Sequence, residues 1–254
     1  MNVLSLFDGM SCGQIALNKA GIKYDKYYAS EIDKYSIKIT QKNYPNTIHM
    51  GDVINVNSSD LPEIDLLIAG SPCQGFSVAG NKLNFDDPRS VLFFEYIRLL
   101  EELKPTYFLL ENVKMKKEWQ DIITKYLKVN PVQINSDLFV QQNRPRIYWT
   151  NIPIKQLPKR PEWDGDFYQY RRTYYRKNKS GVCPCLTANM GTGGHNVPLK
   201  SKDKKDKLSP VECERLQSVP DNYTDGVSNT QRYKMLGNGW TVDVIAHIFK
   251  NLKN

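Results

Sequence analysis

An apolar run that ends in a turn containing glycine, proline and cysteine is the feature that most constrains this chain. Residues 64–68, Ile-Asp-Leu-Leu-Ile, have the pattern of a strand buried on both faces of a parallel sheet. The turn follows at 69–80, with Cys73 near its start. Ligands of open α/β sheets bind just beyond the carboxyl ends of the strands, so Cys73 is placed to act as a nucleophile. A small buried cysteine is the alternative, and this turn alone does not decide between the two.

A second apolar run ends in a carboxylate. Residues 106–110 form this run, and Glu-Asn-Val follows at 111–113. The carboxyl ends of parallel strands meet at one edge of a sheet, so we expect Glu111 and Cys73 to share that edge. A solvated glutamate that opens a loop is the alternative.

Two arginines follow at a spacing that suits the same edge. Arg144 and Arg146 stand two residues apart before the apolar run 147–149, and Gln142 precedes them. Both guanidinium groups can reach one pocket with fixed donor geometry. An exposed basic loop is the alternative.

The start of the chain has the pattern of a nucleotide-binding unit. An apolar run at 3–7 leads into a glycine-containing turn and a predicted helix that ends at Gly21. Free N–H groups at a helix N-terminus bind polar ligand groups. Glu31 ends the next predicted strand, 26–30, where an acidic residue commonly accepts ribose hydroxyls, and Asp52 ends a further segment.

The Pro-Cys turn and the Glu-Asn-Val strand end together resemble the DNA (cytosine-5) methyltransferases. Family motifs continue in the usual order at 142–146, 215–217 and 237–240, so the resemblance covers nearly the whole chain. It implies a Rossmann-like α/β sheet of the S-adenosylmethionine-dependent methyltransferase type, with a small irregular target-recognition lobe. Ser-Leu-Phe-Asp-Gly at 5–9 is more similar to the mammalian de novo DNA methyltransferases than to the usual bacterial pattern.

The resemblance implies S-adenosyl-L-methionine as the cofactor and S-adenosyl-L-homocysteine as its product. The positions that match the family's cofactor site are Phe7, Asp8, Gly9, Met10, Ser11, Glu31, Asp52, Val53, Ile54, Pro72, Asn238, Gly239 and Trp240.

The resemblance also implies a catalytic set of four residues, Cys73, Glu111, Arg144 and Arg146. The Cys73 thiolate would add to carbon 6 of cytosine, and Glu111 would hydrogen-bond or protonate ring nitrogen 3. Arg146 would hold the cytosine carbonyl oxygen, while Arg144 would position the base or the catalytic loop. The polar loop 77–87 would act as a lid over the substrate.

The net charge of +8 is concentrated in one segment. Residues 151–210 contain 13 Lys or Arg and 5 Asp or Glu, so the rest of the chain is neutral. Arginines interleaved with tyrosines at 171–177 favour a polyanion partner, double-stranded DNA, whereas 200–207 has the pattern of a solvated lysine-rich loop. The expected nucleic-acid-binding residues are Gln74, Ser77, Arg89, Gln142, Arg171, Arg172, Arg176, Lys177 and Thr187.

The chain length of 254 residues allows one substantial core and a small appendage. We expect a catalytic and cofactor-binding domain at 1–150, a small basic target-recognition region at 151–210, and a segment at 211–254 that returns to the catalytic domain. Residues 133–140 predict a strand, and 241–252 predict the last helix.

Neither a membrane nor a metal is expected from the sequence. No apolar run reaches the roughly 18 residues that a membrane helix needs. Five cysteines without framework spacing indicate a reducing, cytoplasmic setting in a bacterial or phage-infected cell. Cys183 and Cys185 lack the further ligands that a zinc site requires.

The expected function is methyl transfer from S-adenosylmethionine to carbon 5 of a flipped-out cytosine in a short motif of double-stranded DNA, through a covalent Cys73 adduct. Methylation of a tRNA cytosine and a catalytically inactive DNA-binding role are the alternatives. The small lobe is compatible with a homodimer, and a restriction endonuclease partner is left open, as is the target sequence.

Overall fold

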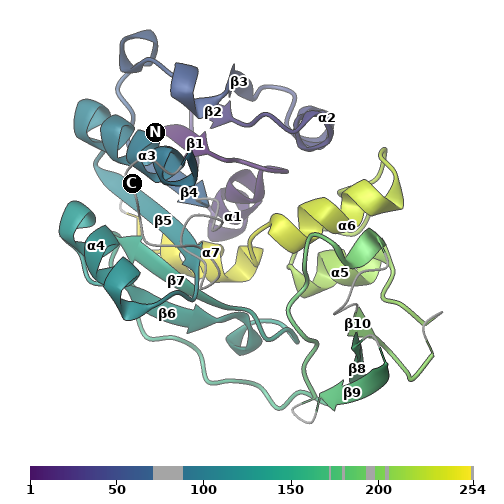
Figure 1. Ribbon diagram of the computed structural model, residues 1–254. Helices are drawn as coiled ribbons and strands as arrows, with labels where there is room; N and C mark the ends of the chain where they lie inside the picture. Colours follow the sequence, from purple (N-terminus) through teal and green to yellow (C-terminus); the bar gives the residue numbers. More distant parts are fainter. Residues whose placement is uncertain (71–87, 172, 179–180, 193–197, 204–205, 253–254) are drawn as a thin grey trace.

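The computed structural model describes residues 1–70, 88–171, 173–178, 181–192, 198–203 and 206–252. Its main sheet has, within these residues, seven strands in the order β3-β2-β1-β4-β5-β7-β6 (Figure 1). The strands are β1 Asn2–Leu6, β2 Lys26–Ser30, β3 Ile48–Gly51, β4 Leu66–Gly70, β5 Tyr107–Val113, β6 Val132–Asn135 and β7 Pro145–Thr150. Strands β1 to β5 pair in parallel, and β7 is antiparallel to both of its neighbours. The predicted α/β class is confirmed.

Both faces of this sheet are covered by helices. The helices are α1 Cys12–Ala20, α2 Lys34–Asn43, α3 Pro88–Leu103, α4 Lys117–Leu127, α5 Pro210–Leu216, α6 Asn229–Asn238 and α7 Val242–Phe249. Helices α1 and α7 pack side by side in one core, which also contains Val3 of β1. Helices α3 and α4 contribute to a second core, which contains Leu4. Successive β1 side chains thus enter opposite cores, which explains the continuous apolar run.

Chain order places the polar strand ends together. Strand β1 lies between β2 and β4. The chain continues from β1 to β2 on one side and from β4 to β5 on the other, so the strand order reverses between β1 and β4, where ligands of such sheets bind. In the pairing of β4 with β5, Gly70 lies opposite Glu111. Residue 73 is only three positions beyond Gly70, although it lies outside the described residues.

The basic segment contains a second sheet, which the sequence did not predict. Strands β8 (Phe167–Arg171) and β9 (Tyr174–Asn178) form an antiparallel hairpin, and β10 (Pro198–Leu199) pairs with β8. The small sheet lies at the lower right of Figure 1, away from β6 and α4. An irregular lobe was expected because residues 151–210 have proline clusters, little helical periodicity and a net positive charge. Aromatic side chains of the hairpin, including Tyr168 and Tyr170, pack against the core that contains α1 and α7 and stabilise the hairpin.

Three further element predictions are corrected. Strand β6 ends at Asn135, because a 3₁₀ turn begins at Ser136, whose hydroxyl donates to the Gln142 carbonyl at 2.7 Å. Helix α6 was not predicted, and the segment 236–238 is its last turn. The final helix is shorter than 241–252 and ends at Phe249. No helix in the described ranges is long and apolar enough to cross a membrane.

A buried ion pair fastens α5 to α6. Glu214 has no exposed side-chain surface, and its Oε1 lies 3.1 Å from Arg232 Nη2. The same carboxylate accepts backbone N–H bonds from Asn222 at 2.7 Å and Thr224 at 2.9 Å. Its charge is thereby compensated on both oxygens, so the segment between the two helices is fixed around it.

We expect Glu214→Gln to lower the free energy of unfolding by about 3 kcal/mol, because Arg232 would lose its buried countercharge. Chemical denaturation monitored by circular dichroism measures this. The control is Asp121→Asn, which removes an exposed i,i+4 pair with Lys117 and should cost less than about 0.5 kcal/mol. Equal effects of the two substitutions would contradict the assigned role of the buried pair.

Candidate active site

The polar strand ends open into a cavity with a volume of about 550 Å³. Its walls come from the ends of β1 to β5, the start of β7, residues 185–188 and the end of α6. The predicted residues that line it are Phe7, Asp8, Gly9, Glu31, Asp52, Val53, Glu111, Arg144, Arg146, Thr187, Asn238, Gly239 and Trp240. The volume is that of a site for a medium-sized organic ligand.

One side of the cavity is built around Glu31. Its Oε2 accepts the Gly9 N–H at 2.7 Å, and its Oε1 accepts the N–H groups of Ile32 and Asp33 at 2.8 Å each. The loop after β1 turns sharply, with φ of 56° at Phe7 and 60° at Gly9. The carboxylate therefore fixes this turn against the start of α2.

Asp8 is a carboxyl group with an unusual pKa in the same wall. Desolvation by burial raises the pKa of Asp8 to about 6, although hydrogen bonds from Ser5, Tyr27 and Ser11 oppose the shift. The Tyr27 hydroxyl donates to Asp8 Oδ1 at 2.8 Å. Asp8 therefore changes its charge close to neutral pH.

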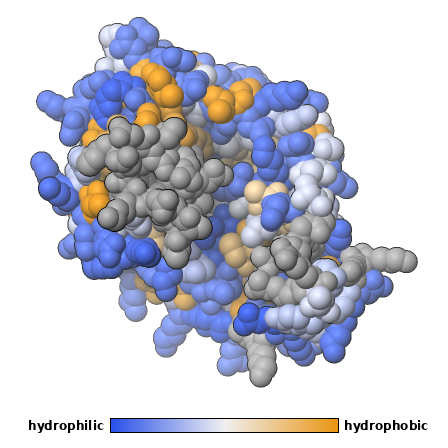
Figure 2. Space-filling model, viewed as in Figure 1, coloured by the Kyte–Doolittle hydropathy of each residue, from blue (hydrophilic) through white to orange (hydrophobic). Residues whose placement is uncertain are grey.

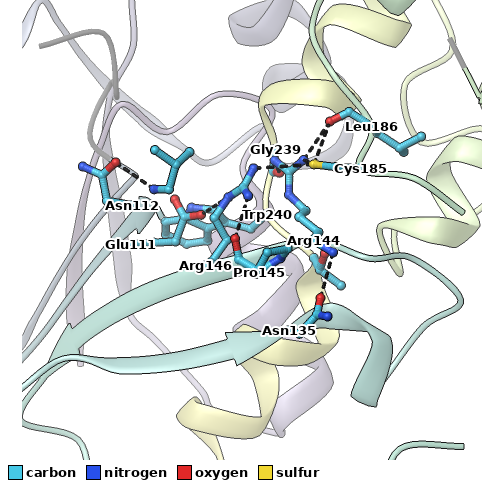
Figure 3. A network of polar contacts seen from close by, with 12 residues as sticks. Glu111, Asn112, Asn135, Arg144, Pro145, Arg146, Cys185, Leu186, Gly239 and Trp240 are labelled. Atoms are coloured by element: carbon cyan, nitrogen blue, oxygen red, sulfur yellow. Dashed lines mark hydrogen bonds and ion pairs between the residues drawn. The ribbon is translucent and has the colours of Figure 1, made fainter. Parts of the chain in front are cut away.

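A buried ion pair forms the opposite side of the cavity. Arg146 Nε lies 2.9 Å from Glu111 Oε1, and the two side chains are only 14% and 10% exposed (Figure 3). Arg146 also donates from Nη1 to the Pro145 carbonyl at 2.9 Å. Burial lowers the pKa of Arg146, but interactions with Glu111, Cys185 and Tyr148 together outweigh it, so the net shift is upward. A carboxylate and a guanidinium thus face the cavity together beside Gly70.

Arg144 is held differently from Arg146. It is 3% exposed, and it donates to the carbonyls of Leu186 at 2.9 Å, Gly237 at 3.0 Å and Gly239 at 2.8 Å. Burial lowers its pKa from the ordinary arginine value. These bonds join Leu186, in the wall formed by residues 185–188, to the end of α6, so Arg144 holds the cavity walls together.

Close packing explains two glycines of this wall. A Cβ on Gly237 would lie 2.2 to 2.4 Å from backbone atoms of Thr187 and Ala188, so only glycine fits there. A Cβ on Gly70 would lie 2.7 Å from Nε1 of Trp240, so the indole seals the end of β4.

Four predicted site residues lie elsewhere. The side chains of Met10 and Ser11 are buried at 1% and 0% exposure, and neither lines the cavity; the Ser11 hydroxyl accepts from Gln14 at 2.8 Å. Ile54 is 54% exposed and does not line the cavity. Its N–H donates to the Asp52 carboxylate. The structure therefore does not bring these three predicted cofactor residues to the cavity surface.

Gln142, a predicted nucleic-acid-binding residue, is buried. Its side chain has no exposed surface. It donates to the Leu216 carbonyl at 2.8 Å and to Gln217 Oε1 at 3.1 Å, and it accepts the Leu186 N–H at 3.0 Å. A fully satisfied buried amide acts as a structural link.

Several predicted residues fall outside the described part of the chain. These are Pro72, Cys73, Gln74, Ser77 and Arg172, together with the loop 77–87. Arg89 and Arg171 lie in α3 and β8. On β9, Arg176 is exposed, and Lys177 Nζ lies 2.6 Å from Asp166 Oδ1.

Three of the further cavity residues, which the sequence did not assign to this site, are Ile32, Lys234 and Cys185. Ile32 is 73% exposed at the cavity beside Glu31, and a large apolar residue after a strand-end carboxylate was its only signal. Lys234 lies 2.7 Å from Asp33 Oδ2 and was missed together with α6. Cys185 lies between Arg144 and Arg146, a position that no local sequence pattern predicts (Figure 3).

Comparison with known proteins identifies the family. The sequence model of the C-5 cytosine-specific DNA methylases matches residues 1–156 and 116–254. The chain is 33% identical to the Type II methyltransferase M.Bsp6I of a Bacillus strain, over 99% of this chain and 98% of that protein. It is 38% identical to the orphan methyltransferase M.SPRI of Bacillus phage SPR, over 89% of this chain and 51% of that protein.

The fold comparison agrees with this. The solved structure of the S. pombe Dnmt2 methyltransferase superposes with a TM-score of 0.75 at 19% identity, over 98% of this chain and 97% of that one, which supports the fold alone. Family match, sequence identity and fold extend over the full described architecture. This chain belongs to the C-5 cytosine-specific DNA methylase family and is a methyltransferase.

Proposed function

We propose that this protein transfers a methyl group from S-adenosyl-L-methionine to carbon 5 of a flipped-out cytosine in a short double-stranded DNA motif, with Cys73 as the nucleophile. The observation that carries the proposal is the buried Glu111–Arg146 pair at the cavity. It lies beside Gly70, the last residue of the strand that leads to Cys73. Family membership supports the same chemistry.

The cavity fits the cofactor chemically. Three carboxylates, of Asp8, Glu31 and Asp52, line it together with the apolar side chains of Ile32 and Val53. Carboxylates suit ribose hydroxyls and a cationic ligand, and apolar side chains suit a purine ring. We assign the cofactor to this side, where it would supply an electrophilic methyl group.

The residues of this chain would make cytosine reactive. Carbon 5 of cytosine is a weak nucleophile, but addition of the Cys73 thiolate to carbon 6 converts the ring to an enamine. A proton shared between Glu111 and ring nitrogen 3 would relieve the charge that builds up on addition. Arg146, already held beside Glu111, is in position to donate to the cytosine carbonyl oxygen. Loss of the carbon 5 proton and expulsion of Cys73 would complete the turnover.

Arg144 takes a different role from the one first expected. Its donors are directed to three backbone carbonyls, so contact with the base would require these bonds to break. We assign it to positioning of the cavity walls.

The basic hairpin supports a nucleic acid partner. The target base must leave the stacked duplex to reach such a cavity, at a cost of a few kcal/mol. Exposed Tyr174 and Arg176 lie on β9, in the segment that carries the net positive charge. The face seen in Figure 2 is mostly hydrophilic, with apolar residues in separate patches. We propose that residues 151–210 contact DNA, while 1–150 and 211–254 form the catalytic body.

DNA is favoured over tRNA by the sequence relatives. M.Bsp6I is named a Type II methyltransferase and M.SPRI an orphan methyltransferase. The likeness to the S. pombe Dnmt2 methyltransferase is one of fold only and carries no argument about the substrate. The relatives include both a Type II and an orphan methyltransferase, so pairing with a restriction endonuclease is a proposal that genomic context would test. Assembly as a homodimer is a separate proposal, which light scattering would test.

Cys73→Ser is expected to abolish methyl transfer while the fold and cofactor binding remain. A serine hydroxyl is a far weaker nucleophile than a thiolate, so the rate should fall at least about a thousandfold. Transfer of labelled methyl to unmethylated duplex DNA, with tRNA in parallel and bisulfite sequencing of the DNA, measures activity and target motif. Full activity of the variant, or label in tRNA alone, would refute the proposal.

The affinity for S-adenosylmethionine should rise with pH through about 6. Asp8 is mostly protonated below its pKa of about 6, and ionisation above it creates a charge that attracts the cationic ligand. We expect the Kd at pH 5.5 to be roughly fourfold weaker than at pH 7.5, measured by calorimetry. S-adenosylhomocysteine lacks the sulfonium charge, so its Kd should vary less, and Asp8→Asn should flatten both profiles. A flat wild-type profile for S-adenosylmethionine would contradict this assignment.

Arg176→Ala should weaken binding to all DNA sequences alike and reduce the slope of log K against log salt by about one. The reason is that Arg176 is an exposed cation of the hairpin. Lys125→Ala, an exposed cation on α4 in the catalytic body, is the charge-matched control and should change little. Fluorescence anisotropy at several salt concentrations measures both variants, and equal slopes for the two would refute a hairpin contact.

A further inference from the structure

Cys185 differs from the other cysteines that the structure describes. Cys12, Cys183 and Cys213 are buried, whereas Cys185 is half-buried; Cys12 and Cys185 both line the cavity. It belongs to the recognition segment that follows the hairpin, yet it faces the catalytic side of the cavity (Figure 3). This thiol therefore joins two functional parts of the protein.

The Cys185 sulfur contacts both arginines. Sγ accepts from Arg144 Nη1 at 3.3 Å and lies 4.0 Å from Arg146 Nη2. Its own S–H is directed to the Leu186 carbonyl at 3.4 Å. The sulfur lone pairs are thus left for the two guanidinium groups.

The two arginines have unequal freedom. Arg144 is fixed by three backbone carbonyls, so it serves as an anchor. Arg146 is held by Glu111 Oε1 and by the carbonyl of its neighbour Pro145. Arg144 and Arg146 repel each other, and this repulsion contributes to the lowered pKa of Arg144. An acceptor between them offsets that repulsion and links Arg146 to the fixed Arg144.

We propose that Cys185 is a positioning residue for methyl transfer, which holds the Arg146 guanidinium against Glu111 by bridging it to Arg144. The inference rests on the proposed function, because the oriented Arg146 is the group assigned to the cytosine carbonyl oxygen. Cys185 acts through Arg146 and has no bond to make or break in the reaction.

The test compares three variants in single-turnover methyl transfer to duplex DNA. Cys185→Ala should lower the rate about fivefold to tenfold while the Kd for S-adenosylmethionine stays within about twofold, because the cofactor wall is untouched. Cys185→Ser keeps an acceptor at this position and should stay within about twofold of the wild type. Cys183→Ala removes a buried thiol two residues away that contacts neither arginine, and it should leave the rate unchanged.

A crystal structure of Cys185→Ala is the second readout, independent of activity, and should show Arg146 turned away from Glu111. An unchanged ion pair would overturn the inference, as would a Cys185→Ala rate within twofold of the wild type or a Cys185→Ser rate as low as that of Cys185→Ala. A Cys183→Ala rate lowered as far would show a merely structural effect and also overturn it. No methyl transfer to DNA by the wild type would refute the proposed function itself, which the crystallographic readout distinguishes from failure of the positioning role.

Discussion

A single buried guanidinium joins the parts of this enzyme that surround its cavity. Arg144 lies just before β7, and its guanidinium donates to the carbonyls of Leu186, Gly237 and Gly239. Burying an arginine costs hydration free energy, and hydrogen bonds to well-placed acceptors compensate for it. The main sheet, the recognition segment and the end of α6 therefore meet at one fixed point.

A network of buried amides supports the same junction. Gln142, which precedes β7, is bonded to Leu216 and Leu186, and Gln217 donates to the Leu236 carbonyl at 2.7 Å. The Thr241 hydroxyl, at the start of α7, donates to Gln217 Oε1 at 2.8 Å. Buried networks whose members are satisfied make a structure rigid, so the cavity walls are organised before any ligand binds. Preorganised walls suit a reaction that depends on holding a base extracted from DNA.

The strand ends could be predicted from the sequence, while the walls opposite them could not. Apolar runs that end in Glu31, Asp52 and Glu111 indicate parallel strands, and the topology then brings their ends to one edge. The burial of Gln142 depends on contacts with residues 44 to 75 positions away, which no local pattern contains. The hairpin β8–β9 was missed because it gains its stability from packing on a distant core rather than from clear alternation.

The two arginines of the 142–146 motif show how far a spacing argument carries. Side chains two residues apart on an extended strand point to the same side, so both reach the cavity, as expected. Their partners nevertheless separate their roles. Arg144 is bound to neutral backbone carbonyls, which a substrate would have to displace, whereas Arg146 is paired with a carboxylate and a thiol on the cavity surface. A substrate that approaches Glu111 also approaches Arg146. A hydrogen bond from Arg146 to the substrate would leave the Arg144 bonds to Leu186, Gly237 and Gly239 in place. Of the two, Arg146 is therefore better placed for the proposed contact with the base, and Cys185, the acceptor that both arginines share, would act on it in the proposed positioning role.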